Sequence, residues 1–277
     1  LLLLLPPPPP PVPSSLFPLL FPAGTVAARL LDDKRGGVER MDFEQVATGH
    51  CLIEAPRWDG AQLWFTDILL GGIHCLRPDG TKQSWLTERT IIGGLALNRD
   101  GKVICSGTGS LAWVDPASGA SGTLLSEMGA GPVNGVNDIF PDGRGGLWLG
   151  TVDHNGLRAG QLNFGQSELW HLAPDGAASR HFTGMSFSNG MGLSPDGKVL
   201  YMNDSGTGTY AHELHEDGTV GNSRLLCDNP NVDGLAVDAE GGVGGIGREV
   251  DNEGPVGGGL DLVDGTREQG TAARGGR

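Results

Sequence analysis

Short stretches in which apolar and polar residues alternate run through the middle of the chain, and most contain an acidic residue followed by glycine. Four stretches show the pattern clearly: residues 93–107 (GGLALNRDGKVICSG), 135–151 (GVNDIFPDGRGGLWLGT), 189–206 (NGMGLSPDGKVLYMNDSG) and 233–245 (DGLAVDAEGGVGG). Alternation with a period of two is typical of strands, and acidic-Gly pairs favour tight turns. The pattern therefore predicts a chain built from β-hairpins.

These turns recur at a regular interval. The successive turn acids are 41, 42, 54 and 44 residues apart, at Asp59, Asp100, Asp142, Asp196 and Glu240. A second hairpin with a glycine-containing turn follows each of the first four, in residues 71–86, 110–125, 168–182 and 211–226. Two hairpins make a four-stranded sheet, and sheets of this size repeated radially form a β-propeller whose innermost strands surround a central axis.

Polar residues near the start of the predicted innermost strands are the candidate site. Asn189 and Asp233 lie seven residues before their turn acids, whereas Glu54 and Asn137 lie five before theirs. Because five and seven differ by two, the four side chains share one face of an extended strand, and we expect them to meet near the axis. Carboxylate and amide oxygens without a companion His or Cys favour a hard cation such as calcium, magnesium or manganese. Each Asn-Gly or Asp-Gly pair alone is also typical of a turn.

Composition fits an all-β chain and narrows the partners. Of the 277 residues 48 are glycine and 6% are aromatic, as expected of turn-rich sheets. The net charge of -14 argues against nucleic acid or an anionic membrane as a partner. The absence of a long apolar run, and four cysteines without paired spacing, favour a cytoplasmic protein with reduced thiols. We expect a monomer or a small homo-oligomer. The histidines lack partner spacing and are interpreted as surface or strand residues.

The two ends of the chain differ from the repeat. Residues 1–40 begin with a Leu block and six prolines, and the prolines and the lack of a basic start argue against a signal peptide. We expect a disordered Leu/Pro-rich leader there and a propeller domain in residues 41–242. Residues 243–277 contain few large apolar side chains, which predicts a Gly-rich, disordered tail and an incomplete propeller.

Four ordered motifs resemble those of the SMP-30/gluconolactonase/LRE family. They are IEAPRWDG (53–60), NDIFPDGRGGLWLGT (137–151), SNGMGLSPDGKVLYMNDS (188–205) and VDGLAVDAEGG (232–242). The resemblance implies a six-bladed β-propeller, of which about four to five blades are represented in this chain. It also implies a metal-dependent lactonase, a hydrolase that opens a small cyclic ester by attack of a metal-activated water.

The resemblance also implies roles for single residues. Glu54, Asn189 and Asp233 match the family's ligands of one divalent ion, for which calcium is our first expectation and zinc, magnesium or manganese are alternatives. Asp233 is in addition the expected general base. Asn137, with Asp138 beside it, matches the residue that contacts the water or the substrate.

Two further positions bear on the resemblance. Asp204 matches a signature position that we interpret as stabilising its blade. Sugar-lactonase members carry an Arg two residues before the N-D motif, whereas this chain has Gly135 there. A polyhydroxylated sugar lactone is therefore less favoured as the substrate.

Alternatives to a lactonase remain at this level. A propeller phosphotriesterase or arylesterase would use the same ion on a different substrate. A non-catalytic propeller, acting as a calcium-binding or interaction scaffold, would keep the packing residues alone, because a fold does not fix a function.

Overall fold

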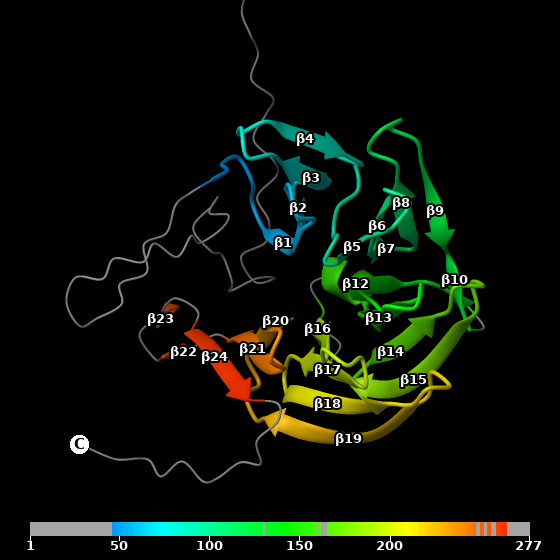
Figure 1. The fold of residues 1–277 in the computed structure, drawn as a ribbon, viewed down its shortest axis with the longest axis vertical. Coiled ribbons are helices and arrows are strands. Elements are labelled where there is room, and N and C mark those ends of the chain that lie inside the picture. The colour runs from blue at the N-terminus through cyan, green and yellow to red at the C-terminus, as the bar shows by residue number, and fades with distance from the viewer. Residues whose placement is uncertain are drawn as a thin grey trace, which may run out of the picture.

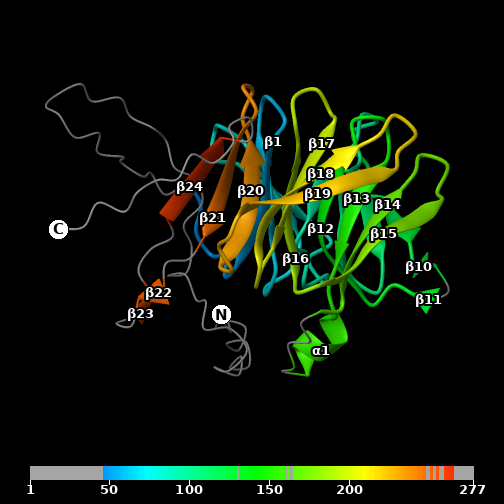
Figure 2. The ribbon, with the colours of Figure 1, turned by 90° about the horizontal axis from the view of Figure 1, so that it is seen from below.

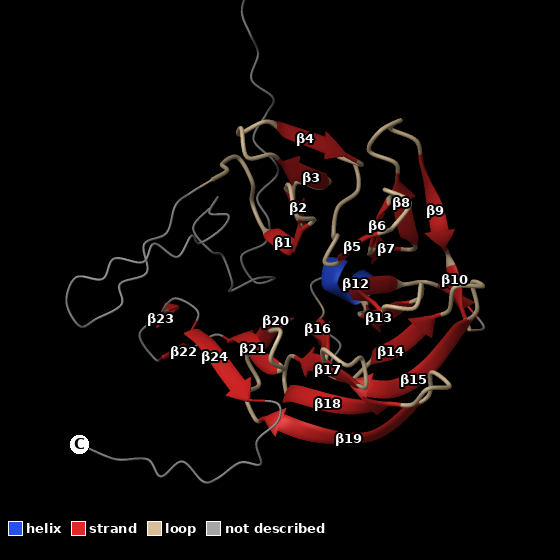
Figure 3. Cartoon of the chain, viewed as in Figure 1, coloured by secondary structure: helices blue, strands red, loops and turns tan. Residues whose placement is uncertain are grey.

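The computed structural model describes residues 46–129, 131–159, 161, 165–247, 250–251, 254–255 and 259–264. Strands form almost all of the regular structure in these ranges, and the helix α1 (His154–Arg158) is a single short turn (Figure 3). The all-β class predicted from the alternating pattern is confirmed.

The first two sheets are regular four-stranded blades. The first contains β1 (Ile53–Trp58), β2 (Leu63–Asp67), β3 (Ile73–Leu76) and β4 (Lys82–Trp85), in that order and antiparallel. The second contains β5 (Leu95–Leu97), β6 (Val103–Cys105), β8 (Leu111–Val114) and β9 (Ser121–Leu125). Each blade is two hairpins in sequence order, as the spacing of the turns predicts.

The third and fourth sheets repeat this order. The third contains β12 (Gly135–Pro141), β13 (Leu147–Thr151), β14 (Ser167–Leu172) and β15 (Ala178–Met185), and β7 (Gly107–Thr108) pairs with the free side of β12. The fourth contains β16 (Ser188–Leu193), β17 (Val199–Asp204), β18 (Gly208–Leu214) and β19 (Val220–Cys227). A small hairpin of β10 (Glu127–Met128) and β11 (Gly131–Pro132) connects the second sheet to the third.

A fifth sheet has three strands in the described part of the chain. They are β20 (Val232–Val237), β21 (Gly242–Gly247) and β24 (Gly259–Asp264), and a short pair, β22 (Val250–Asp251) with β23 (Gly254–Pro255), lies between them in sequence. Strand pairing thus continues past residue 242, where the sequence predicts the start of a disordered tail. The leader of residues 1–40 and the rest of the tail lie outside the described residues.

The sheets follow one another around an arc, with β1, β5, β12, β16 and β20 innermost (Figure 1). Seen from the side, β1, β12, β16 and β20 run in the same general direction, and α1 projects beyond one end of the sheets (Figure 2). The described residues supply four complete blades and part of a fifth, which confirms a β-propeller with four to five of its blades represented.

Buried apolar side chains fill the space between consecutive sheets. Ile73 and Val114 belong to the cluster between the first and second sheets, and Leu149 and Leu111 to the next. Met191 and Leu200 pack with the third sheet's Trp148, and further clusters continue toward the fifth sheet. Because each blade is packed on its neighbours, the innermost strands are held in a fixed register relative to one another.

Candidate metal centre

A one-residue β-bulge interrupts four of the innermost strands near their starts. The register shifts between Val136 and Ile139 in β12 and at the matching points of β16 and β20, whereas in β1 it shifts one residue later, between Glu54 and Arg57. Each predicted site residue comes directly after the first residue that pairs with the following strand: Asn137, Asn189 and Asp233 begin the bulge, and Glu54 is paired with Thr66 just before it. A bulge bends a strand and re-aims its side chains, so all four residues stand where the direction of their strand changes.

Glycines near the starts of two innermost strands allow neighbouring strands to approach closely. A Cβ added to Gly190 would lie 2.3 Å from the backbone nitrogen of Leu235 in β20. A Cβ added to Gly94 would lie 2.5 Å from the backbone nitrogen of Ile139 in β12. Close backbone contact, and not strand propensity, therefore explains Gly190 in the Asn-Gly pair near the start of β16.

Three carboxylates from three sheets interact at this end of the strands. Burial raises the pKa of Glu54 well above its usual value, and the negative charges of Asp233 and Asp138 raise it further. Burial also raises the pKa of Asp138 to about 6, with a contribution from Asp233, although the nearby Arg57 cation opposes the shift. Because like charges at close range repel, the cluster is suited to a cation that would relieve this repulsion.

The Asn137 amide is oriented by a backbone carbonyl. Its Nδ2 donates to the backbone carbonyl oxygen of Ser188 at 2.9 Å. The backbone carbonyl of Asn137 accepts a hydrogen bond from the Ser106 hydroxyl at 2.6 Å. The Oδ1 atom lies over Gly93, which holds the place in the second sheet where the other innermost strands carry a site residue. Asn137 thus offers its side-chain oxygen as an acceptor, with its nitrogen already bonded to the neighbouring blade.

Residues at the end of β17 form hydrogen bonds with two predicted ligands, Asp233 and Asn189. Asn203 donates through Nδ2 to the carbonyl of Asp233 at 2.8 Å and accepts the Thr209 hydroxyl at 2.7 Å. Ser205 accepts a hydrogen bond from Nδ2 of Asn189 at 3.1 Å. Neither Asn203 nor Ser205 was predicted as a site residue, although both lie in the third family motif, residues 188–205.

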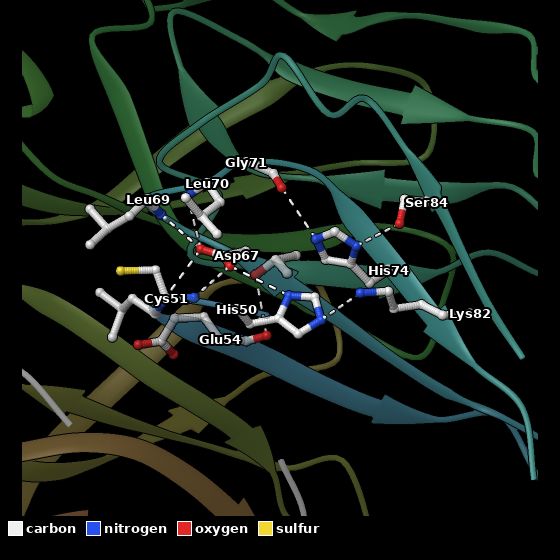
Figure 4. Close-up of polar contacts among 12 residues, drawn as sticks. His50, Cys51, Glu54, Asp67, Leu69, Leu70, Gly71, His74, Lys82 and Ser84 are labelled. Carbon is white, nitrogen blue, oxygen red and sulfur yellow. Dashed lines mark hydrogen bonds and ion pairs between the residues drawn. The ribbon is translucent and has the colours of Figure 1, made fainter. Parts of the chain in front are cut away.

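Asp67 fixes the segment that leads into Glu54 (Figure 4). Its carboxylate accepts the backbone N–H groups of Cys51 at 2.9 Å and Leu52 at 3.4 Å, and it lies 3.5 Å from Nδ1 of His50. Burial, followed by the nearby Lys82 charge, lowers the pKa of His50. A fully buried acid, which the sequence analysis did not identify, therefore holds the residues two and three positions before Glu54.

Asp204 makes the same arrangement in the fourth sheet. It accepts the backbone N–H groups of Ser186 at 3.1 Å and Phe187 at 2.8 Å, three and two positions before Asn189. Asp204 pairs with the first residue of β16 just as Asp67 pairs with the first residue of β1. These contacts agree with the interpretation that Asp204 stabilises its blade.

The space beside Gly135 is filled by a histidine. A Cβ at Gly135 would lie 2.3 Å from Cγ of His154, whose Nδ1 is 3.1 Å from the Thr108 hydroxyl. Burial, followed by the charges of Arg158 and Arg89, lowers the pKa of His154 to about 4. His154 is fully buried in α1, so its interpretation as a surface or strand residue is wrong.

Oxygen donors dominate the candidate centre. In the described part of the chain, no group of three or more His, Cys, Asp or Glu forms a metal site by itself. The predicted ligand set is not a group of that kind, because it combines the carboxylates of Glu54 and Asp233 with the amide of Asn189. That donor chemistry fits a hard divalent cation.

The sheets and the carboxylate cluster at their axial ends define an all-β propeller with an acidic centre. The chain belongs to the SMP-30/gluconolactonase/LRE family, because residues 52–244 match the family described as "SMP-30/Gluconolactonase/LRE-like region". The membership predicted from the four motifs is confirmed.

Named relatives include lactonases and regucalcins. A pentonolactonase of Haloferax volcanii is 27% identical over 245 residues, which cover 80% of this chain and 78% of that protein. Regucalcin of Xenopus laevis is 30% identical over 201 residues, 68% of this chain and 65% of that protein. The solved structure of a regucalcin from Agrobacterium tumefaciens, described as a calcium-binding protein, has a TM-score of 0.61 and 25% identity over 75% of this chain and 73% of that one.

The remaining expectations concern the chain as a whole. No helix among the described residues is long and apolar enough to cross a membrane. All four cysteines lie in the described ranges, and none forms a disulfide. The cytoplasmic location, the oligomeric state and the exclusion of nucleic acid stay predictions.

Proposed function

We propose that this chain hydrolyses a lactone, and that Glu54, Asn189 and Asp233 hold the divalent cation that the reaction requires. The observation that carries the proposal is the mutual repulsion of Glu54, Asp138 and Asp233 at the axial strand ends of a lactonase-family propeller. Burial of like charges is costly unless a counter-charge is present. A cation at this point would offset that cost.

In ring opening, Asp233 would act as the general base. Asp233 accepts a proton from the attacking water while the water oxygen bonds to the lactone carbonyl carbon. The bond from that carbon to the ring oxygen then breaks, the ring oxygen gains a proton, and a hydroxy acid is released. A divalent cation supplies positive charge that acidifies water and stabilises the developing oxyanion.

Asn137 and Asp138 are proposed to orient the substrate. Since one amide proton of Asn137 is bonded to Ser188, its Oδ1 is the atom available to accept a hydrogen bond from the water or a substrate hydroxyl. The positive charge of Arg57 lies near the Asp138 carboxyl and favours its charged form. With the His154 ring beside Gly135 in place of a charged side chain, a lactone with few hydroxyl groups is the preferred substrate class.

Calcium is the cation we propose first. The donor set contains only oxygen, and regucalcins are among the relatives, one of them described as calcium-binding. Zinc, magnesium and manganese are the alternatives, because the same oxygen donors are also compatible with these ions.

The test is lactone hydrolysis followed by pH-stat. Purified protein is treated with chelator and then given calcium, zinc, magnesium or manganese, with Asp233→Ala alongside. We expect a metal to restore turnover, and Asp233→Ala to lose it by a factor of roughly 10² or more. Folded protein without turnover on any lactone would favour the scaffold instead, and turnover of only aryl or phosphate esters would favour the esterase alternative.

A further inference from the structure

Ser205 lies in a fixed position between the fourth and fifth sheets. It directly follows β17, and its backbone N–H donates to the carbonyl of Phe187 at 2.9 Å. The preceding residue, Asp204, accepts the N–H groups of Phe187 at 2.8 Å and Ser186 at 3.1 Å, so three hydrogen bonds join this end of β17 to the segment before β16. The Ser205 hydroxyl is therefore held beside Asn189 on one side and β20 on the other.

The direction of the hydrogen bonds made by Ser205 follows from its partners. The hydroxyl donates to the backbone carbonyl of Val232, which can only accept. A serine hydroxyl has one proton, so its oxygen can then only accept from Asn189. The Nδ2 atom of Asn189, at 3.1 Å, supplies that donor.

This chain of bonds determines which end of the Asn189 amide faces Ser205. The two ends of an Asn amide are almost the same size, so the hydrogen-bonding partners alone select the orientation. With Nδ2 turned toward Ser205, the Oδ1 atom is turned away from it. Asn137 has the same polarity, since its Nδ2 donates to the carbonyl of Ser188.

We propose that Ser205 is a positioning residue that turns the Asn189 amide so that Oδ1, and not the NH₂ group, is presented to a divalent cation. The inference rests on the proposed function, because it concerns the same centre. Without Ser205 the amide is free to rotate, and an NH₂ group facing a cation would oppose binding. Val232 belongs to the strand that carries Asp233, so Ser205 also links the two ligand-bearing strands.

Calcium titration of chelator-treated protein by calorimetry tests the proposal. We expect Ser205→Ala to bind calcium roughly 10- to 100-fold more weakly than the wild type, as is usual when a residue that orients a ligand is removed. Ser194→Ala is the matched control: it removes a hydroxyl from the other end of the same hairpin, where Ser194 bonds Asp196 and Val199. The control should bind as the wild type does.

A second background separates orientation from general loosening. Asn189→Asp replaces the amide by a carboxylate, which presents an oxygen in either rotamer. In that background Ser205→Ala should change calcium affinity by less than about threefold, whereas a merely structural effect would be as large as in the wild type. Neutron diffraction of metal-free protein gives a direct readout, with deuterium on Nδ2 expected to point at Ser205 Oγ.

The possible failures are distinguishable. Equal calcium affinity of Ser205→Ala and the wild type, or deuterium on Ser205 pointing at Asn189, would overturn the role of Ser205 and leave the proposed lactonase intact. Absence of binding by the wild type for calcium, zinc, magnesium and manganese would overturn the cation site itself, and the inference with it.

Discussion

Gly93 of the second sheet lies directly against Asn137 of the third: a Cβ on Gly93 would stand 2.6 Å from Oδ1 of Asn137 and 2.8 Å from its carbonyl oxygen. Gly93 occupies the place that holds a site residue in the other innermost strands. The absence of a side chain there leaves room for the Asn137 oxygen.

Gly93→Ala should displace Asn137. Because one of the two clashes is with backbone, we expect a loss of about 1–3 kcal/mol in the free energy of unfolding, together with reduced turnover. Urea unfolding and pH-stat assays measure the two effects. Gly131→Ala is the control, since a Cβ at Gly131 meets nothing within 4 Å. Wild-type stability in Gly93→Ala would contradict the packing described here.

Asp67→Asn should destabilise the first blade. The carboxylate accepts backbone N–H groups on both oxygens, whereas an amide would turn its NH₂ group toward one set of donors. We expect a loss of about 2–3 kcal/mol in unfolding free energy, as for hydrogen bonds to a buried charge. Asp79→Asn, at an exposed turn where Asp79 bonds Thr81, should cost less than about 1 kcal/mol. Similar losses in both variants would argue against a special role for Asp67.

The carboxylate cluster should make the metal-free protein less stable as pH rises. The pKa of Asp138 is about 6 in the folded chain and about 4 in an unfolded one. The folded state therefore binds the proton more tightly, and the stabilisation present below about pH 4 is lost as pH rises through about 6.

Asp138→Asn isolates this contribution. In chelator, the variant should match the wild type near pH 4 and exceed its unfolding free energy by on the order of 1–2 kcal/mol near pH 8. A difference that stays constant with pH would show that Asp138 does not titrate in this way.

Calcium should stabilise the chain against unfolding. At a free calcium concentration 100 times the dissociation constant, the expected gain is about 2.7 kcal/mol. Glu54→Gln should abolish the gain, because it removes one of the predicted carboxylate ligands. Asp142→Asn, in the turn at the far end of β12, should keep it. Thermal unfolding with calcium or chelator measures both, and an undiminished gain in Glu54→Gln would remove Glu54 from the ligand set.

Local patterns made much of the fold predictable. The hairpins of β3 with β4 and of β18 with β19 follow from alternation and turn glycines, both of which are short-range signals. Asn137 lies five residues before its turn acid and Asn189 lies seven before its own. The two residues nevertheless have the same register in their strands, because the acid stands at different points of the two turns. The bulges themselves depend on strand pairing and could not be deduced from one strand.

The supporting residues depend on contacts distant in sequence. Asp67 acts on residues about 15 positions earlier in the chain, and Ser205 acts across two strands. Their types alone fit many roles, so only the assembled sheets show what they hold. The glycine-rich β21 still pairs with β20 and β24, because backbone hydrogen bonds require no large side chains.

In four of the five innermost strands, a bulge separates residues with two different roles. Residues after the bulge, such as Ile139 and Met191, pack between sheets, whereas the residue at or just before its start is the predicted site residue. Gly93 shows that this single position can carry no side chain at all while the blade remains intact. The chemistry of the centre therefore depends on one position per blade, and the space left by the neighbouring strand decides which side chain that position accepts.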